Sequence, residues 1–573
     1  MVPPLLLSSR MRIVLAMLFV TLGACTESAT TTPPDDPGAV SPTAVFLSPP
    51  QHLTRVSMTL RGVRPSVEDL QAVAEDPDVL PSIVDRYLAS PEFGETIREL
   101  HNETLLVRVE QPTMTYPPLG ALATTTAREM NDGLFEEPLR LIEDIVMTDQ
   151  PYTKIVTANY TMANGVTSAI WGIPHTGAMN EWKKSSYSDG RVPAGILSTT
   201  AFHHRWRSTG FNYNRGRANE ISRALLCHDF LGADIEIDTS VDLSDPDVVA
   251  NAVIANKSCA GCHQTLDPLA SYLFVYRGSL APVGVDAYPV TYYQPAQINR
   301  WKTANKRPPM FFGADTGGMG GLGEAIANDP RFAKCTAQRF ASYMSEVPQN
   351  QISGAWVARM QKALVDSNWN AKALAKAIVL SDEFRVSHDT DDERAEALVG
   401  ALKARPEQLH RMIQDITGFG WSTTSALRLR GIPYGTANLL ESDFIGFRVL
   451  AGGIDSYFVT DPVHTMNATS SLVAKTAAAS ASDFVVEHDL TAAAAARTLF
   501  KEAAVTATEP DRIRAQIAYL HARIYGELVA ADSPEVDETY ALYTEAFTDT
   551  PDRARAWKIT LVGMLSDFRS LFY

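Results

Sequence analysis

The chain has 573 residues, of which 45% are apolar and 20% are charged, and its formal net charge is −16 at pH 7. This length is too great for a single hydrophobic core, so we expect about three or four domains. The acidic balance argues against nucleic-acid binding, which depends mainly on lysine and arginine contacts to phosphates.

Residues 1–24 are predicted to be a lipoprotein signal peptide. Two arginines precede an apolar run at 13–22, which is too short to cross a bilayer as a helix. The following Leu22-Gly23-Ala24-Cys25 resembles the lipobox of bacterial lipoproteins, in which the cysteine is acylated and begins the mature chain. We therefore expect lipidation at Cys25, with an ordinary secretory signal as the alternative. Thr26 favours the outer membrane, by resemblance to the sorting rule of Gram-negative lipoproteins.

A Ser/Thr/Pro-rich tether is predicted at residues 25–50, where the sequence has no periodicity. An N-terminal helical domain is expected at 51–240, because Ala, Leu, Glu and Arg dominate its periodic segments. No later segment has 18 uninterrupted apolar residues, so we expect the lipid to be the membrane attachment.

The sequence Cys259-Ala260-Gly261-Cys262-His263 matches CxxCH, the attachment pattern of c-type haem. At this spacing two thiols add across the two haem vinyl groups, and the histidine that follows supplies an axial ligand to the iron. With 12 histidines and five cysteines in the chain, about 0.001 such matches are expected by chance. We therefore predict one covalent haem c held by Cys259, Cys262 and His263.

Two other interpretations of these cysteines remain open. Cys227, His228, Cys259 and Cys262 could form a Cys₃His zinc site. That site would need reduced thiols in an oxidising compartment, and it leaves His263 without a role. A plain Cys259–Cys262 disulfide is the other alternative.

A helix is predicted immediately before the motif. Ser244-x-x-Asp247 resembles a capping box, and Pro246 suits the first helical turn. Apolar residues then recur at helical spacing. We expect a helix of about a dozen residues that runs directly into the CxxCH motif.

The segment Cys259–Gly278 resembles the haem segment of the "planctomycete cytochrome" domains, which occur in large secreted proteins of planctomycetes and myxobacteria. Asp267-Pro268-Leu269 and Gly278 match that pattern, whereas Ala270-Ser271 stands where the family usually has Gly-Phe. Shorter sequence motifs similar to those of these domains extend the resemblance over roughly residues 50–390. The resemblance implies a cytochrome c-like haem unit at 241–390, and it brings no established function.

A disulfide between Cys227 and Cys335 is predicted by elimination. Cys25 is assigned to lipid, and two more cysteines are assigned to haem, which leaves this pair in a compartment that favours oxidation. Both cysteines lie in predicted helices that flank the haem unit. The alternative is two buried free thiols.

The sixth iron ligand has several candidates. Met310 follows Pro308-Pro309, and Met319 lies among glycines that we expect to form a free loop. Methionine ligation raises the reduction potential of a haem. A histidine such as His203 or His204, or an open coordination site, is the alternative.

The fold is expected to be mainly α, a multi-unit helical protein with a cytochrome-like unit in the middle and a C-terminal helical domain at 391–573. Short strands are expected near 286–293. The predicted function is electron transfer through one haem at the cell envelope, with an unidentified redox protein as partner. The alternatives are a haem-dependent, peroxidase-like oxidoreductase and an envelope scaffold or adhesion protein with structural haem.

Overall fold

The computed structural model describes residues 40–41, 43–110, 116–208, 212–232, 238–242, 244–278, 285–390 and 399–573. Helices make up 56% of the structure, and the described strands form three two-stranded sheets. The prediction of a mainly α protein with few short strands is therefore confirmed. The predicted signal peptide and Cys25 lie outside the described residues.

Short polar side chains begin many helices in the N-terminal part. Ser48 and Ser90 each precede a proline, which fits the first helical turn because its missing N–H needs no partner there. The Ser66 hydroxyl accepts a hydrogen bond from the backbone N–H of Asp69. The helices of this part are α1 (Pro49–Arg61), α2 (Val67–Glu75), α3 (Leu80–Leu88), α4 (Pro91–Leu105), α5 (Ala127–Phe135), α6 (Glu137–Met147), α7 (Lys154–Thr157), α8 (Gly165–Trp171), α9 (Thr200–Arg205) and α10 (Arg215–Leu226).

The central helices begin in the same way. Asp245 and Asp329 each cap a helix whose first residue is proline. The helices of this part are α11 (Pro246–Ala255), α12 (Lys257–Ser271), α13 (Met319–Ala327), α14 (Pro330–Ser345), α15 (Gly354–Asp366), α16 (Ala371–Val379) and α17 (Asp382–Arg385).

The C-terminal helices pack around Trp557, which is fully buried and meets Phe500 edge-on at 5.1 Å between ring centroids. The alanine-rich α20 packs on α23, and small buried side chains such as Ala477 and Ala481 permit this close approach. The helices of this part are α19 (Pro406–Thr417), α20 (Ala468–Thr491), α21 (Pro510–Leu520), α22 (Pro534–Asp549), α23 (Arg553–Leu565) and α24 (Phe568–Leu571).

The strands lie elsewhere than predicted. Residues 285–293 form no strand, and Tyr293 makes only an isolated bridge to Tyr276. The longest hairpin lies instead in the C-terminal third and turns at Arg430-Gly431, two residues with positive φ. The predicted tether also ends before residue 50, because a strand and the first turn of α1 belong to the fold. The antiparallel pairs are β1 (Ala44–Phe46) with β4 (Val386–Asp389), β2 (Thr161–Ala163) with β3 (Lys183–Ser185), and β5 (Ser422–Leu429) with β6 (Ile432–Asn438).

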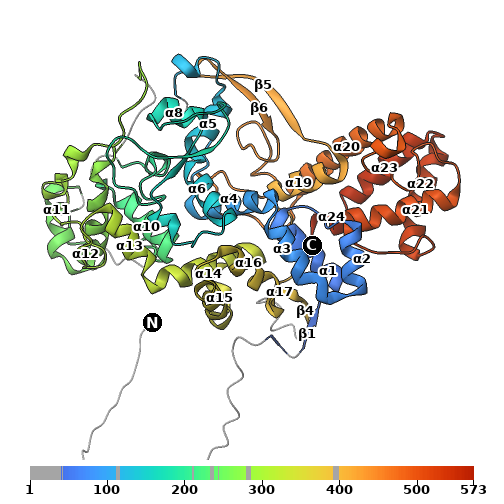
Figure 1. Ribbon diagram of the computed structural model, residues 1–573, viewed down its shortest axis with the longest axis horizontal. Coiled ribbons are helices and arrows are strands. Elements are labelled where there is room, and N and C mark those ends of the chain that lie inside the picture. The colour runs from blue at the N-terminus through green and yellow to red at the C-terminus, as the bar shows by residue number, and fades with distance from the viewer. Residues whose placement is uncertain are drawn as a thin grey trace, which may run out of the picture.

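Two large hydrophobic cores organise the molecule. The first takes residues between Leu53 and Leu402, so the segments 51–240 and 241–390 share one core. The second takes Met58 together with residues between Ala404 and Leu571. Figure 1 places α11 and α12 at one end of the long axis and α21 and α22 at the other.

Buried arginines of the first helices join distant parts of the chain. Arg55 donates hydrogen bonds to backbone carbonyls at the end of α17 and the start of β4, and Arg64 donates to carbonyls of α24. Tyr573 and Leu402 exchange two backbone hydrogen bonds of 2.9 Å each. The C-terminus therefore lies beside α1, as Figure 1 shows.

Candidate haem site

The CxxCH motif lies in the second of two consecutive helices, not at the end of one. Asp245, rather than Ser244, caps α11, because its carboxylate accepts hydrogen bonds from two backbone N–H groups of the first turn. Helix α11 ends at Ala255. The Asn256 side chain then accepts from two N–H groups of α12 and starts the new helix. The helix that carries the motif is therefore α12.

The three motif side chains lie on one face of α12, because residues three and four positions apart are neighbours on a helix. Cys259, Cys262 and His263 are all partly exposed. A side chain at Gly261 would meet no atom within 4 Å, so the motif borders open space. From Leu266 onward the helix is buried in the first core. Its exposed half presents the motif, and its buried half anchors it.

A buried carboxylate holds the imidazole of His263. His263 Nδ1 lies 3.0 Å from Oδ1 of Asp267, one turn further along α12, and the Asp267 side chain has no exposed surface. Arg215, the first residue of α10, donates to both oxygens of this carboxylate at 2.6 and 3.0 Å. Burial raises the pKa of Asp267, but the hydrogen bonds from His263 and Arg215 outweigh it and hold the pKa below its usual value. An ionised carboxylate only accepts hydrogen bonds, so a neutral imidazole at this contact carries its proton on Nδ1 and has Nε2 as its free nitrogen.

These residues fit a covalently attached haem. Such a group needs two free thiols, a nitrogen ligand and apolar surface against the porphyrin. Cys259 and Cys262 are free thiols in the structure. Helix α11, which packs against α12, is strongly apolar yet leaves Val248 38% and Ile254 42% exposed. The chain thus offers two free thiols and a nitrogen ligand on α12, and exposed apolar side chains on the neighbouring α11.

The structure separates the two methionine candidates. The Asn305 side chain donates to the carbonyl of Asp267 at 2.9 Å, and the Met310 N–H donates to the carbonyl of Pro268 at 3.3 Å. Met310 is therefore held against α12. Met319 does not lie on a free loop, because it begins α13, which packs on α7, and is buried in the first core. Met310 is the candidate that the fold brings to the helix of the motif.

His203 and His204 are core side chains. His203 Nε2 bonds to the carbonyl of Leu197 at 2.7 Å, and its ring stacks on Tyr276. Burial lowers the pKa of His204 to about 3 among the rings of Tyr116, Phe135, Trp171 and Tyr292. Neither residue has exposed surface, which argues against either as an iron ligand.

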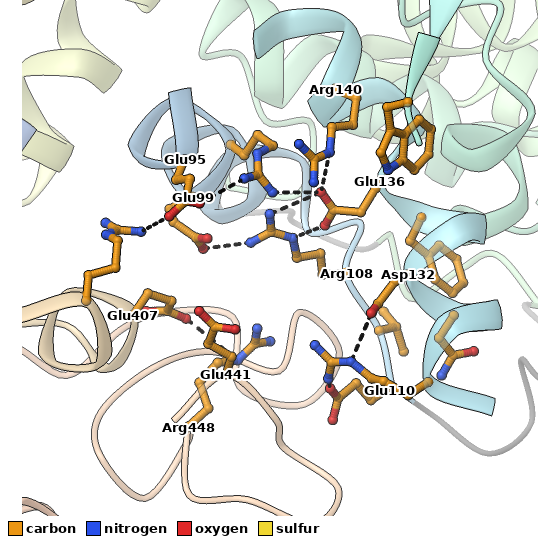
Figure 2. Close-up of a pocket in the computed structure, with 17 residues that line it drawn as sticks. Glu95, Glu99, Arg108, Glu110, Asp132, Glu136, Arg140, Glu407, Glu441 and Arg448 are labelled. Carbon is orange, nitrogen blue, oxygen red and sulfur yellow. Dashed lines mark hydrogen bonds and ion pairs between the residues drawn. The ribbon is translucent and has the colours of Figure 1, made fainter. Parts of the chain in front are cut away.

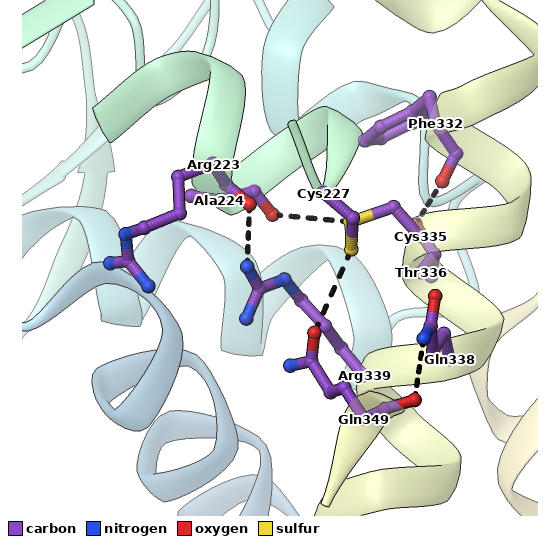
Figure 3. The surroundings of a disulfide bond; sticks show 9 residues. All are labelled: Arg223, Ala224, Cys227, Phe332, Cys335, Thr336, Gln338, Arg339 and Gln349. Atoms are coloured by element: carbon purple, nitrogen blue, oxygen red, sulfur yellow. Dashed lines mark hydrogen bonds between the residues drawn. A yellow bond between two sulfur atoms is a disulfide. The ribbon is translucent and has the colours of Figure 1, made fainter. Parts of the chain in front are cut away.

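The predicted disulfide between Cys227 and Cys335 is confirmed. Their Cα atoms are 5.4 Å apart, and the bond joins the end of α10 to α14 (Figure 3). Because Cys227 is part of this disulfide, it cannot serve as a ligand in the alternative Cys₃His zinc site. No group of three or more His, Cys, Asp or Glu side chains suited to a metal ion is found among the residues that the structure describes. Cys259 and Cys262 are not bonded to each other, so the alternative disulfide between these two cysteines is not formed either.

A second site, away from α12, is a charged cavity of about 320 Å³. Its wall brings side chains of α4 to α6 opposite those of α19 and of residues 439–453 (Figure 2). Arg108 pairs with Glu99 at 2.7 Å and with Glu136, and Arg411 of α19 reaches Glu95 of α4 at 3.5 Å. The charges pair mainly with one another, so the cavity serves as an ionic interface between the two large cores.

Sequence reasoning missed this cavity, because its members come from distant segments and no local motif contains them. The pKa values of two of its acidic residues are shifted in opposite directions. Burial and the neighbouring carboxylate of Glu99 raise the pKa of Glu407 to about 7. Arg108 and Arg98 hold the pKa of Glu136 down at about 2, against its burial.

We predict that Glu407→Gln stabilises the protein at pH 8 but not at pH 4. A raised folded-state pKa contributes stability below the unfolded value near 4.5, and that contribution is lost as the pH rises through 7. The neutral glutamine avoids the loss, which amounts to about 3 kcal/mol for a shift of this size. Chemical unfolding at the two pH values measures the difference. Glu441→Gln, in the same cavity but more exposed, is the control. An equal effect of Glu407→Gln at both pH values would contradict the prediction.

Comparisons with protein-family models, with curated proteins and with solved structures found no match to this chain. Within the described residues, no helix combines the length and the apolar character needed to cross a membrane.

Proposed function

We propose that this protein is a lipid-anchored c-type cytochrome of the cell envelope that transfers electrons through one haem. In this proposal Cys259 and Cys262 hold the haem covalently, and His263 is an axial ligand of the iron. When bound, the haem supplies a one-electron iron couple. Acylated Cys25 anchors the chain to the outer membrane, and a redox protein is the partner.

The arrangement on α12 carries the proposal. Two free thiols and a histidine share one exposed helical face, and the histidine is held through Nδ1 so that Nε2 remains available. An accidental CxxCH sequence has no need of a fixed histidine tautomer. The resemblance of Cys259–Gly278 to the haem segments of planctomycete cytochrome domains supports the same assignment.

A haem-dependent, peroxidase-like oxidoreductase is the second candidate. The observation that favours it is the carboxylate behind His263, because such a partner makes an axial histidine a stronger electron donor to iron. The two candidates differ in coordination: electron transfer suits a six-coordinate, low-spin iron, and peroxide chemistry needs an open position.

The deciding experiment is a spectroscopic redox titration of the exported, haem-matured protein. A low-spin spectrum with a single reversible one-electron transition supports electron transfer. A high-spin iron that turns over peroxide would replace this proposal with the second candidate. Absence of covalent haem would overturn both.

Met310→Ala is predicted to change the iron spin state or to lower the midpoint potential, because loss of a methionine sulfur removes a ligand that raises the potential. Met319→Ala is the matched control, and we expect it to leave both properties unchanged because Met319 packs in the core. Optical spectra and redox titration of the two variants measure the difference. If neither variant differs from the parent protein, methionine ligation at these positions is wrong.

A further inference from the structure

We propose that Asp267 is a positioning residue that sets the orientation and the electron-donating strength of the axial His263, and that Arg215 limits its effect. This inference rests on the proposed function. It concerns three side chains of α10 and α12 that the structure joins into one chain of contacts, His263–Asp267–Arg215.

The geometry leaves the Asp267 carboxylate little freedom. It is fully buried, and it lies in the half of α12 that is packed into the first core, so it cannot turn to solvent. Residues four positions apart on a helix are neighbours, which places its Oδ1 3.0 Å from His263 Nδ1. The bidentate contact from Arg215 fixes the plane of the carboxylate from the opposite helix. The imidazole is thereby held in one tautomer before any ligand binds.

The chemical consequence follows from the identity of the acceptor. A carboxylate that accepts the second N–H of a metal-bound histidine raises the basicity of that ligand. A more basic ligand stabilises ferric iron over ferrous iron and lowers the reduction potential. The guanidinium of Arg215 shares the same carboxylate and withdraws part of its charge, so it opposes this effect. Asp267 therefore lowers the reduction potential of the haem, and Arg215 raises it.

The test compares midpoint potentials of the haem-matured protein and its variants. Asp267→Asn, which keeps the shape but loses the charge, is expected to favour the ferrous form about tenfold, a rise of about 59 mV for one electron. Arg215→Gln is expected to shift the potential in the opposite direction. Asp247→Asn removes an exposed charge from the neighbouring α11 and should leave the potential unchanged. The iron–histidine stretching frequency, read from the five-coordinate ferrous iron that photolysis of the CO complex leaves, should fall in Asp267→Asn alone, which a purely structural role would not cause.

The failures of the inference and of the proposed function are distinguishable. A parent protein without covalent haem overturns the proposed function. Covalent haem in the parent and in Asp267→Asn, with equal potentials and equal stretching frequencies, overturns the inference. Should the variants fail to mature, nitrogen NMR of the haem-free parent decides: His263 protonated at Nδ1 supports the inference, and protonation at Nε2 contradicts it.

Discussion

Replacing Cys227 and Cys335 together with alanine will lower the free energy of unfolding of the first core by about 3–5 kcal/mol. The bond closes a loop of 108 residues, and its loss gives the unfolded chain the freedom that this closure removes. The loop contains the whole of α11 and α12, so we expect the loss of stability to affect the part of the molecule that holds the candidate haem site. Denaturant unfolding followed by circular dichroism measures the change.

The chain provides a matched control for this experiment. Cys259→Ala with Cys262→Ala, in the haem-free protein, removes two cysteines that lie inside the same loop but are not bonded. Its unfolding midpoint should stay close to that of the parent protein. Equal losses in the two double variants, or no loss in the first, would contradict a stabilising disulfide.

Replacing Cys259 and Cys262 together with serine is predicted to abolish covalent haem entirely. Each thioether depends on one of these sulfurs, and a serine hydroxyl does not replace a thiol in this attachment. Each single variant should keep one possible thioether and retain less haem than the parent. Haem-dependent peroxidase staining after denaturing electrophoresis measures what stays bound.

The haem-loaded Cys227→Ala/Cys335→Ala protein is the control for this prediction. It also loses two cysteines but keeps both thiols of α12, so its haem should resist denaturation as in the parent. Covalent haem that persists in the Cys259→Ser/Cys262→Ser protein would show that attachment takes place elsewhere.

Several features of the fold could be predicted from local sequence. Serine or aspartate followed by proline marks a helix start by a short-range rule, and Ser48-Pro49 and Asp329-Pro330 both obey it. The disulfide could be predicted because the other three cysteines had chemical assignments of their own. These inferences need no knowledge of long-range packing.

The missed features depend on long-range packing. Strand β5 is almost entirely exposed, so it lacks the alternation of apolar and polar residues that signals a half-buried strand. It is held by β6, which packs on α5 some 300 residues earlier in the chain. The glycines around Met319 predict a free loop, yet tertiary packing makes the same residues the first turn of α13. Likewise, the contact between Arg215 and Asp267 joins two helices, and no local sequence motif predicts it.

The central claim is that one haem is covalently attached to α12, and the intact mass of the exported protein after denaturation tests it most directly. We expect the mass of the mature lipoprotein plus one haem, with the added mass on the peptide that contains Cys259 and Cys262. A pyridine haemochrome of the same sample should show two thioether bonds. A mass that equals the mature chain alone, from cells that attach haem to another c-type cytochrome, would contradict the account.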